Sequence, residues 1–112
     1  MTRIRLAIAT LAALGAGAFA TLALAAATPL AGTVGPGFTI TMKKPTKAGS
    51  YKLTVTDRSS IHNFHIVGPG VNKRTSVPST GKTTWTLTLK KGTYRFLCDP
   101  HPTSMKGSFR VS

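Results

Sequence analysis

The chain has 112 residues, of which 15 are Lys or Arg and 2 are Asp or Glu, for a formal net charge of +13 at pH 7. This length predicts a single domain, and the one cysteine excludes a disulfide within the monomer. The basic residues are scattered, without a recognition helix or an interleaved aromatic platform, which argues against nucleic acid as a partner.

Residues 1–27 have the layout of a secretory signal peptide, with a short basic start, an uncharged stretch from 6 to 27 and small residues at its end. Cleavage is expected after Ala25 or Ala27. The stretch of 22 residues is also long enough for an uncleaved membrane anchor, but its many Ala, Gly and Thr residues favour cleavage. We therefore expect an exported protein in the periplasm, at the cell surface or in the medium.

The mature chain left by cleavage is strongly basic and has 87 or 85 residues, depending on the site used. Loss of Arg3 and Arg5 lowers the formal charge from +13 to +11. This excess predicts attraction to anionic cell surfaces and to acidic protein partners. We expect a monomer with no membrane span after cleavage.

The next segment, residues 28–37, contains two prolines and three glycines and is expected to be a flexible lead. From Phe38 onward, apolar and polar residues alternate in short runs, which predicts half-buried strands. These runs are Phe38–Met42, Tyr51–Thr56, Trp85–Leu89, Tyr94–Cys98 and Ser108–Val111. Residues 60–66 are read as a further strand, which follows a turn at 57–60.

Turn signals rich in Gly and Pro separate the predicted strands, and no helical periodicity follows residue 28. Short strands at this spacing indicate an all-β fold, a small antiparallel sandwich or barrel with Greek-key connections and about seven or eight strands. Residues 38–112 are expected to form this domain.

The candidate site lies in the stretch CDPHPTSM, residues 98–105, which contains Cys98, His101 and Met105. Two further histidines, His62 and His65, occur about 35 residues earlier. A thiolate, two imidazoles and a thioether form a soft donor set that suits copper, whereas zinc sites rarely include methionine. Because His62 and His65 are three residues apart, they would face opposite sides of a regular strand, so only one of them can face the metal.

The pattern YRFLCDPHPTSMKG at residues 94–107, with His62–Asn63 upstream, resembles the blue copper proteins (cupredoxins) of the plastocyanin, pseudoazurin and amicyanin group. The His–Met spacing differs: three residues separate His101 from Met105, against two in amicyanin and four in plastocyanin. This difference affects the expected axial ligation rather than the existence of the site.

The resemblance implies one type 1 copper site, which alternates between Cu(I) and Cu(II). It implies His62, Cys98 and His101 as strong ligands and Met105 as a weak axial one. The asparagine that follows His62 matches the family pattern, which favours His62 over His65. Asn63 is expected to support the site through a backbone N–H to sulfur bond and a side-chain link between the ligand loops.

The resemblance also implies an electron carrier between larger redox proteins rather than an enzyme, with the electron passing near His101. Pro69, Pro102 and Pro36 are expected to form a flat docking patch around this histidine, and Asp99 is expected to face solvent. A copper carrier or scavenger is the alternative function. A surface sandwich with a vestigial site is a third.

Overall fold

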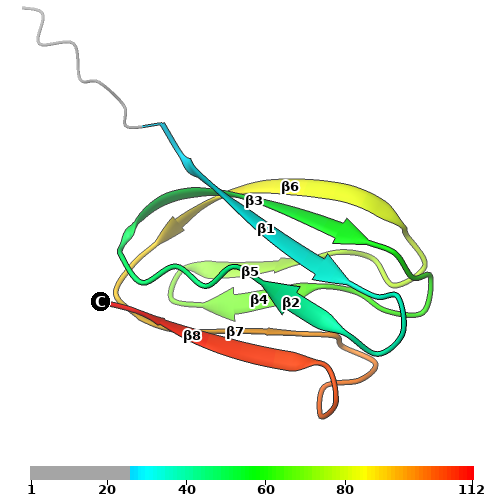
Figure 1. The fold of residues 1–112 in the computed structure, drawn as a ribbon. Coiled ribbons are helices and arrows are strands. Elements are labelled where there is room, and N and C mark those ends of the chain that lie inside the picture. The colour runs from blue at the N-terminus through cyan, green and yellow to red at the C-terminus, as the bar shows by residue number, and fades with distance from the viewer. Residues whose placement is uncertain (1–25) are drawn as a thin grey trace, which may run out of the picture.

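In the computed structural model, which describes residues 26–112, two four-stranded β-sheets pack face to face (Figure 1). One sheet has the strand order β2-β1-β3-β6 and the other β5-β4-β7-β8. The strands are β1 (Thr28–Val34), β2 (Ile40–Met42), β3 (Gly49–Asp57), β4 (His65–Gly68), β5 (Val71–Arg74), β6 (Gly81–Leu89), β7 (Gly92–Leu97) and β8 (Lys106–Val111). The predicted all-β sandwich of seven or eight strands is thus confirmed.

The signal peptide prediction falls almost entirely on residues 1–25, which lie outside the described part of the chain. In the part that is described, no helix could cross a membrane.

The prediction of a flexible lead is wrong for most of its length, because Thr28–Val34 forms β1. β1 pairs in parallel with β3 along all seven residues, so the sheet is not purely antiparallel. Pro29 is tolerated because β2 pairs with β1 only at residues 32–34, which leaves the neighbouring edge free at Pro29. Leu30 and Val34 are buried in the core, and this burial gives the strand its register.

The core lies between the sheets and is built from the alternating inward residues of both. On one side β3 contributes Tyr51, Leu53 and Val55, which follow the predicted alternation. On the other side stacked aromatic pairs fill the space, and the ring centroids of Tyr94 and Phe109 are 5.2 Å apart. The hydroxyl of Tyr94 is buried with the ring and accepts a hydrogen bond from the Lys90 N–H at 2.8 Å, which offsets its desolvation.

The ends of the strands define the place of the candidate site. β1 and β3 end, and the loop between β7 and β8 begins, at the same end of the sandwich, on the right in Figure 1. β4 runs the opposite way and is antiparallel to β7. The start of β4 therefore lies beside the end of β7, and this arrangement brings the His62 segment to the Cys98 segment.

Candidate metal centre

The candidate ligands all lie in loops at this end of the sandwich. Cys98 directly follows β7, and Met105 directly precedes β8. His62 lies in the connection between β3 and β4, since β4 begins only at His65. The prediction of a strand over residues 60–66 is therefore wrong at its start. Residues 58–64 belong to no strand and include a turn at residues 60–61, so the argument from strand faces does not apply to His62.

Three of the predicted residues meet at one point. The Nδ1 atoms of His62 and His101 are 3.1 Å apart, and the Cys98 Sγ lies 3.7 Å from the first and 3.6 Å from the second. The centre of this triangle is about 2.0 Å from each atom, close to the bond lengths of about 2.0–2.3 Å that His and Cys make to a transition metal. The three side chains thus fit a single metal ion.

The centre is enclosed on most sides. Cys98 and Met105 are fully buried and His62 is 1% exposed, while His101 is half-buried. A buried site with two imidazoles and a thiolate in a trigonal arrangement is the donor set of blue copper centres.

Backbone hydrogen bonds fix the loop between Cys98 and Met105. The Cys98 N–H donates to the Met105 carbonyl, the His101 N–H to the Cys98 carbonyl, and the Met105 N–H to the His101 carbonyl, each at 3.0 Å. These bonds close the loop on itself and place the backbone of buried Met105 beside that of Cys98. The loop can close in this way despite its unusual His–Met spacing.

Asn63 joins the histidine loop to the cysteine loop, as predicted. Its Oδ1 accepts a hydrogen bond from the Asp99 N–H at 2.7 Å, and its Nδ2 donates to Asp99 Oδ2 at 2.7 Å and to the Thr75 carbonyl at 3.2 Å. The expected hydrogen bond from the Asn63 backbone N–H to the Cys98 sulfur is not found among the described residues, where Cys98 Sγ contacts the imidazoles of His62 and His101.

Asp99 does not simply face solvent, contrary to expectation. Its Oδ1 lies 2.8 Å from Nδ1 of His65, whose Nε2 lies 2.6 Å from Oδ1 of Asn72. Partial burial raises the pKa of Asp99, but the hydrogen bonds from Asn63 and His65 and the charges of His65 and Arg74 outweigh it and lower this pKa below its ordinary value. His65 therefore stands outside the metal triangle and supports it through Asp99.

One residue at the site was missed by the sequence reasoning. The Phe38 ring is 60% exposed, and its centroid lies 5.0 Å from the ring centroids of both His62 and His101, edge to face. The sequence shows it only as an apolar residue after a Gly-Pro-Gly turn. Its contact with the two histidines depends on where that turn lies in space, which the local sequence does not indicate.

The predicted docking patch is wrong in one member. Pro69 follows β4 and lies beside Gly92 and Tyr94 at the start of β7, whereas Cys98 follows the end of that strand. Six residues of β7 separate the two ends by about 20 Å, and Figure 1 shows the end of β4 on the side opposite the site. Pro36 and Pro102 are exposed at the site end.

The chain matches the model of the family described as copper binding proteins, plastocyanin/azurin family, over residues 33–112. No curated protein matches it.

Solved structures with the same fold include reduced rusticyanin, at 23% identity and a TM-score of 0.58 over 75% of this chain and 78% of that one. Auracyanin A, a blue copper protein from the green thermophilic photosynthetic bacterium Chloroflexus aurantiacus, matches at 16% identity and a TM-score of 0.51, over 76% of this chain and 98% of that one. A methionine-to-glutamine variant of amicyanin in the Cu(I) form matches at 20% identity and a TM-score of 0.52, over 75% and 82% of the two chains.

The donor triangle, the sandwich and the family match agree: this chain belongs to the plastocyanin/azurin family of copper binding proteins, the cupredoxins, and its cofactor is copper.

Proposed function

We propose that this cupredoxin is a one-electron carrier between larger redox proteins, with His62, Cys98 and His101 as strong copper ligands and Met105 as the weak axial ligand. The observation that carries the proposal is the triangle of two Nδ1 atoms and one Sγ, with sides of 3.1, 3.6 and 3.7 Å. Bound copper supplies a reversible one-electron change between Cu(II) and Cu(I).

The surrounding residues keep the ligands in place during this change. The bonds between Asn63 and Asp99 hold the two ligand segments together, and the backbone bonds of the 98–105 loop fix Cys98 relative to Met105. A frame of this kind limits rearrangement when the charge of the site changes, which favours fast electron transfer. His101 is half-buried and offers the most exposed ligand edge for the electron.

The burial of the ligands also favours electron transfer over copper delivery. Handing a metal ion to another protein requires ligands that the acceptor can reach, but Cys98 and Met105 are fully buried and His62 nearly so. A site closed in this way suits transfer of an electron better than transfer of the ion.

The test is a visible spectrum of the mature protein after addition of Cu(II), followed by cycles of reduction with ascorbate and reoxidation with ferricyanide. We expect an intense thiolate-to-copper band that is lost in Cys98→Ser and returns in each cycle of the wild-type protein. Copper binding without the band, or loss of copper on reduction, would instead support the copper carrier.

Export forms part of the proposal and has its own measurement. The N-terminal pattern at residues 1–27 supports it. Mass spectrometry of the protein recovered from outside the cytoplasm should give a chain that begins at Ala26 or Thr28. Recovery of the full-length chain in the membrane fraction would show that the segment is kept as an anchor.

A further inference from the structure

The outer face of β7 and β8 carries a group of basic side chains. Along both strands the alternate residues are buried in the core, so the others point to solvent. The outward residues are Thr93, Arg95 and the partly exposed Leu97 on β7, and Lys106, Ser108 and Arg110 on β8.

The register places three of these residues close together. Arg95 pairs with Ser108, so Lys106 and Arg110 lie two positions to either side of its partner. Such diagonal neighbours are about 7–8 Å apart, within reach of long side chains. We call Arg95, Lys106 and Arg110 the cation trio.

The cation trio has no counter-charge. The whole sequence holds two acidic residues, of which Asp57 is buried at the end of β3 and Asp99 is bonded to Asn63 and His65. Like charges at this spacing repel one another, and nothing in the described chain offsets the repulsion at the trio. A bound anionic group would offset this repulsion.

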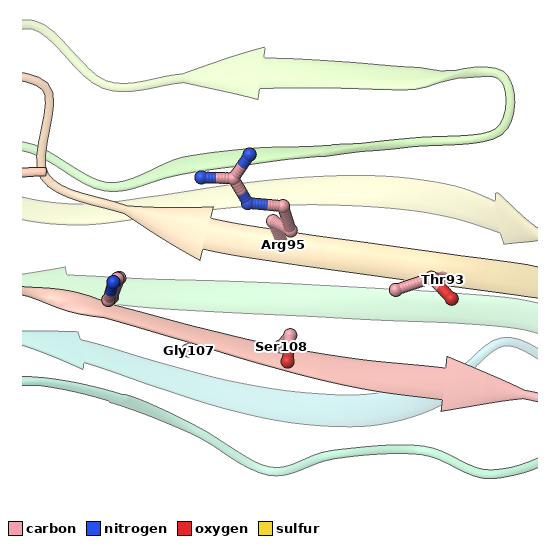
Figure 2. A pocket seen from close by; sticks show the side chains of 5 residues that line it. Thr93, Arg95, Gly107 and Ser108 are labelled. Carbon is pink, nitrogen blue, oxygen red and sulfur yellow. The ribbon is translucent and has the colours of Figure 1, made fainter.

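A hollow lies within this surface, with a volume of about 500 Å³. Figure 2 shows its lining on the two adjacent strands, with the guanidinium of Arg95 and the hydroxyls of Thr93 and Ser108. Lys106 and Gly107 complete the lining. Guanidinium and hydroxyl groups side by side can bind a carboxylate through charge-assisted hydrogen bonds.

The opposite sheet shows that this arrangement is not general to the surface. The outward face of β3 and β6 is largely threonine, with a bond of 3.1 Å between the hydroxyls of Thr54 and Thr84. Its two lysines, Lys52 and Lys82, are four strand positions apart, because Lys52 pairs with Thr86. That distance is about 13 Å along the strand, too far for one carboxylate to bind both.

We propose that the cation trio and its hollow form a docking surface for an acidic segment of the protein that exchanges electrons with this one. This inference rests on the proposed electron-carrier function. Lys106 directly follows Met105, and its strand partner Leu97 directly precedes Cys98. A partner bound at the Lys106 end of the trio therefore lies beside the copper end of the molecule, while Arg110, which pairs with Thr93, extends the surface toward the other end.

A protein segment fits this face better than a lipid bilayer does. Among residues 26–112, the exposed large apolar side chains, Phe38 and Ile61, lie in the loops around the site, and the apolar neighbours of the trio, Val67 and Leu97, are only partly exposed. This face thus has no exposed large apolar side chain to insert into a membrane, while it offers a hollow for discrete carboxylates.

The experiment is a titration of the mature, isotope-labelled Cu(I) protein with a peptide of six glutamates, followed through its backbone amide NMR signals, and repeated without copper. We expect shifts concentrated in residues 93–97 and 106–110. The variant Arg95→Gln/Lys106→Gln should bind the peptide about tenfold more weakly or worse. The variant Lys52→Gln/Lys82→Gln removes the same charge from the opposite sheet and should bind within about twofold of wild type.

Equal weakening in the two double variants, or shifts spread over both sheets, would overturn the proposal in favour of general charge attraction. Binding to phosphatidylglycerol vesicles that needs Arg95 and Lys106, without binding of the peptide, would reassign the surface to membranes. None of these readouts uses the copper spectrum. If the peptide does not bind at the trio, the electron-carrier proposal is unaffected. If the protein does not bind copper as proposed, the titration of the copper-free protein can still be interpreted.

Discussion

Asn63 and Asp99 exchange two hydrogen bonds across the site, one from the Asp99 N–H to Asn63 Oδ1 and one from Asn63 Nδ2 to Asp99 Oδ2, both 2.7 Å long. Each residue is adjacent to a candidate ligand, Asn63 to His62 and Asp99 to Cys98. The pair therefore fixes the distance between two ligands that are 36 residues apart in the chain.

Replacing Asn63 by Ala should weaken both the fold and the metal site. The Asp99 N–H and the Thr75 carbonyl would lose their partner, and leaving buried polar groups unpaired costs about 1–3 kcal/mol. Copper affinity should fall by about 10–100-fold, as is usual when a residue that orients metal ligands is removed. Urea unfolding of the copper-free protein and a competitive copper titration measure the two effects.

The control is Asn72→Ala. Asn72 is exposed and contacts His65 on the side away from Asp99. We expect a change in unfolding free energy within about 0.5 kcal/mol and unchanged copper affinity. Equal effects of the two variants would show that the Asn63–Asp99 pair does not hold the ligands.

Sequence alternation was sufficient for the strands whose residues face core and solvent in turn. β3, β6 and β8 each contain a predicted run, and β7 contains all of one except Cys98, because burial on one face imposes a period of two. β1 and β5 were missed. β1 is rich in Gly, Ala and Pro and gains its stability from parallel pairing with β3, a contact between distant segments that local propensity does not reveal.

In the candidate site, too, residues close in the sequence could be predicted and contacts between distant loops could not. Cys98, His101 and Met105 stand within eight residues, so their spacing carried the prediction. The contacts of Phe38 and the place of Pro69 depend on which loops share an end of the sandwich. That arrangement follows from strand order and direction, which the sequence pattern does not specify.

Asp57→Asn should stabilise the copper-free protein at neutral pH. Burial raises the pKa of Asp57 above its ordinary value of 3.8, against smaller opposing effects of the Ser59 N–H and the His62 charge. Its Oδ2 is buried and without a partner in the described chain. Because the pKa is higher in the folded state, the charged carboxylate destabilises that state, and the penalty grows as pH rises from 3.8 through the folded pKa. Asparagine keeps an oxygen for the Ser59 N–H but has no charge.

We expect Asp57→Asn to gain about 1 kcal/mol at pH 7 and to lose this advantage near pH 3.5. Asp99→Asn is the matched comparison with the opposite sign. The lowered pKa of Asp99 means that its carboxylate stabilises the fold above pH 3.8, and that this contribution is lost as pH falls through the folded pKa. Urea unfolding at both pH values checks the pair, and a loss of stability in Asp57→Asn at pH 7 would contradict the assignment.

Gly107→Ala should destabilise the sandwich beside the metal loop. A Cβ atom at Gly107 would overlap the ring of Phe96, its strand partner. Phe96 is buried and stacks on Phe64 at 5.8 Å between centroids, so its ring cannot move away freely. Overpacking of this kind costs about 1–3 kcal/mol. The free energy of unfolding in urea measures it.

The variant Gly32→Ala provides the comparison, because a Cβ there would lie 3.2 Å from the edge of the Phe64 ring, which is closer than an ordinary contact but much less severe than the overlap at Gly107. Its cost should be clearly smaller. Adding Phe96→Leu to Gly107→Ala should recover part of the loss, so that the two substitutions are less than additive. Full additivity would mean that the overlap with Phe96 is not the cause.

Phe38→Ala should change the copper site while leaving the fold intact. The ring is 60% exposed, so its removal uncovers little core, and the copper-free protein should lose no more than about 0.5 kcal/mol. The same ring lies edge to face against both His62 and His101, so we expect it to limit the access of water to these imidazoles. Without it the site becomes more polar, which stabilises Cu(II) over Cu(I) and lowers the reduction potential. Loss of copper to a chelator should become about tenfold faster.

Ile61→Ala tests whether the effect belongs to this contact or to exposed apolar side chains near the site in general. Ile61 is 56% exposed and adjacent to His62 in the chain, so its truncation removes similar surface from the same end of the molecule. Spectroelectrochemical titration should give the wild-type potential for Ile61→Ala and a lower one for Phe38→Ala. An equal shift in both would assign the effect to the polarity of the whole end. No shift in Phe38→Ala would mean that water already reaches the two imidazoles past the ring.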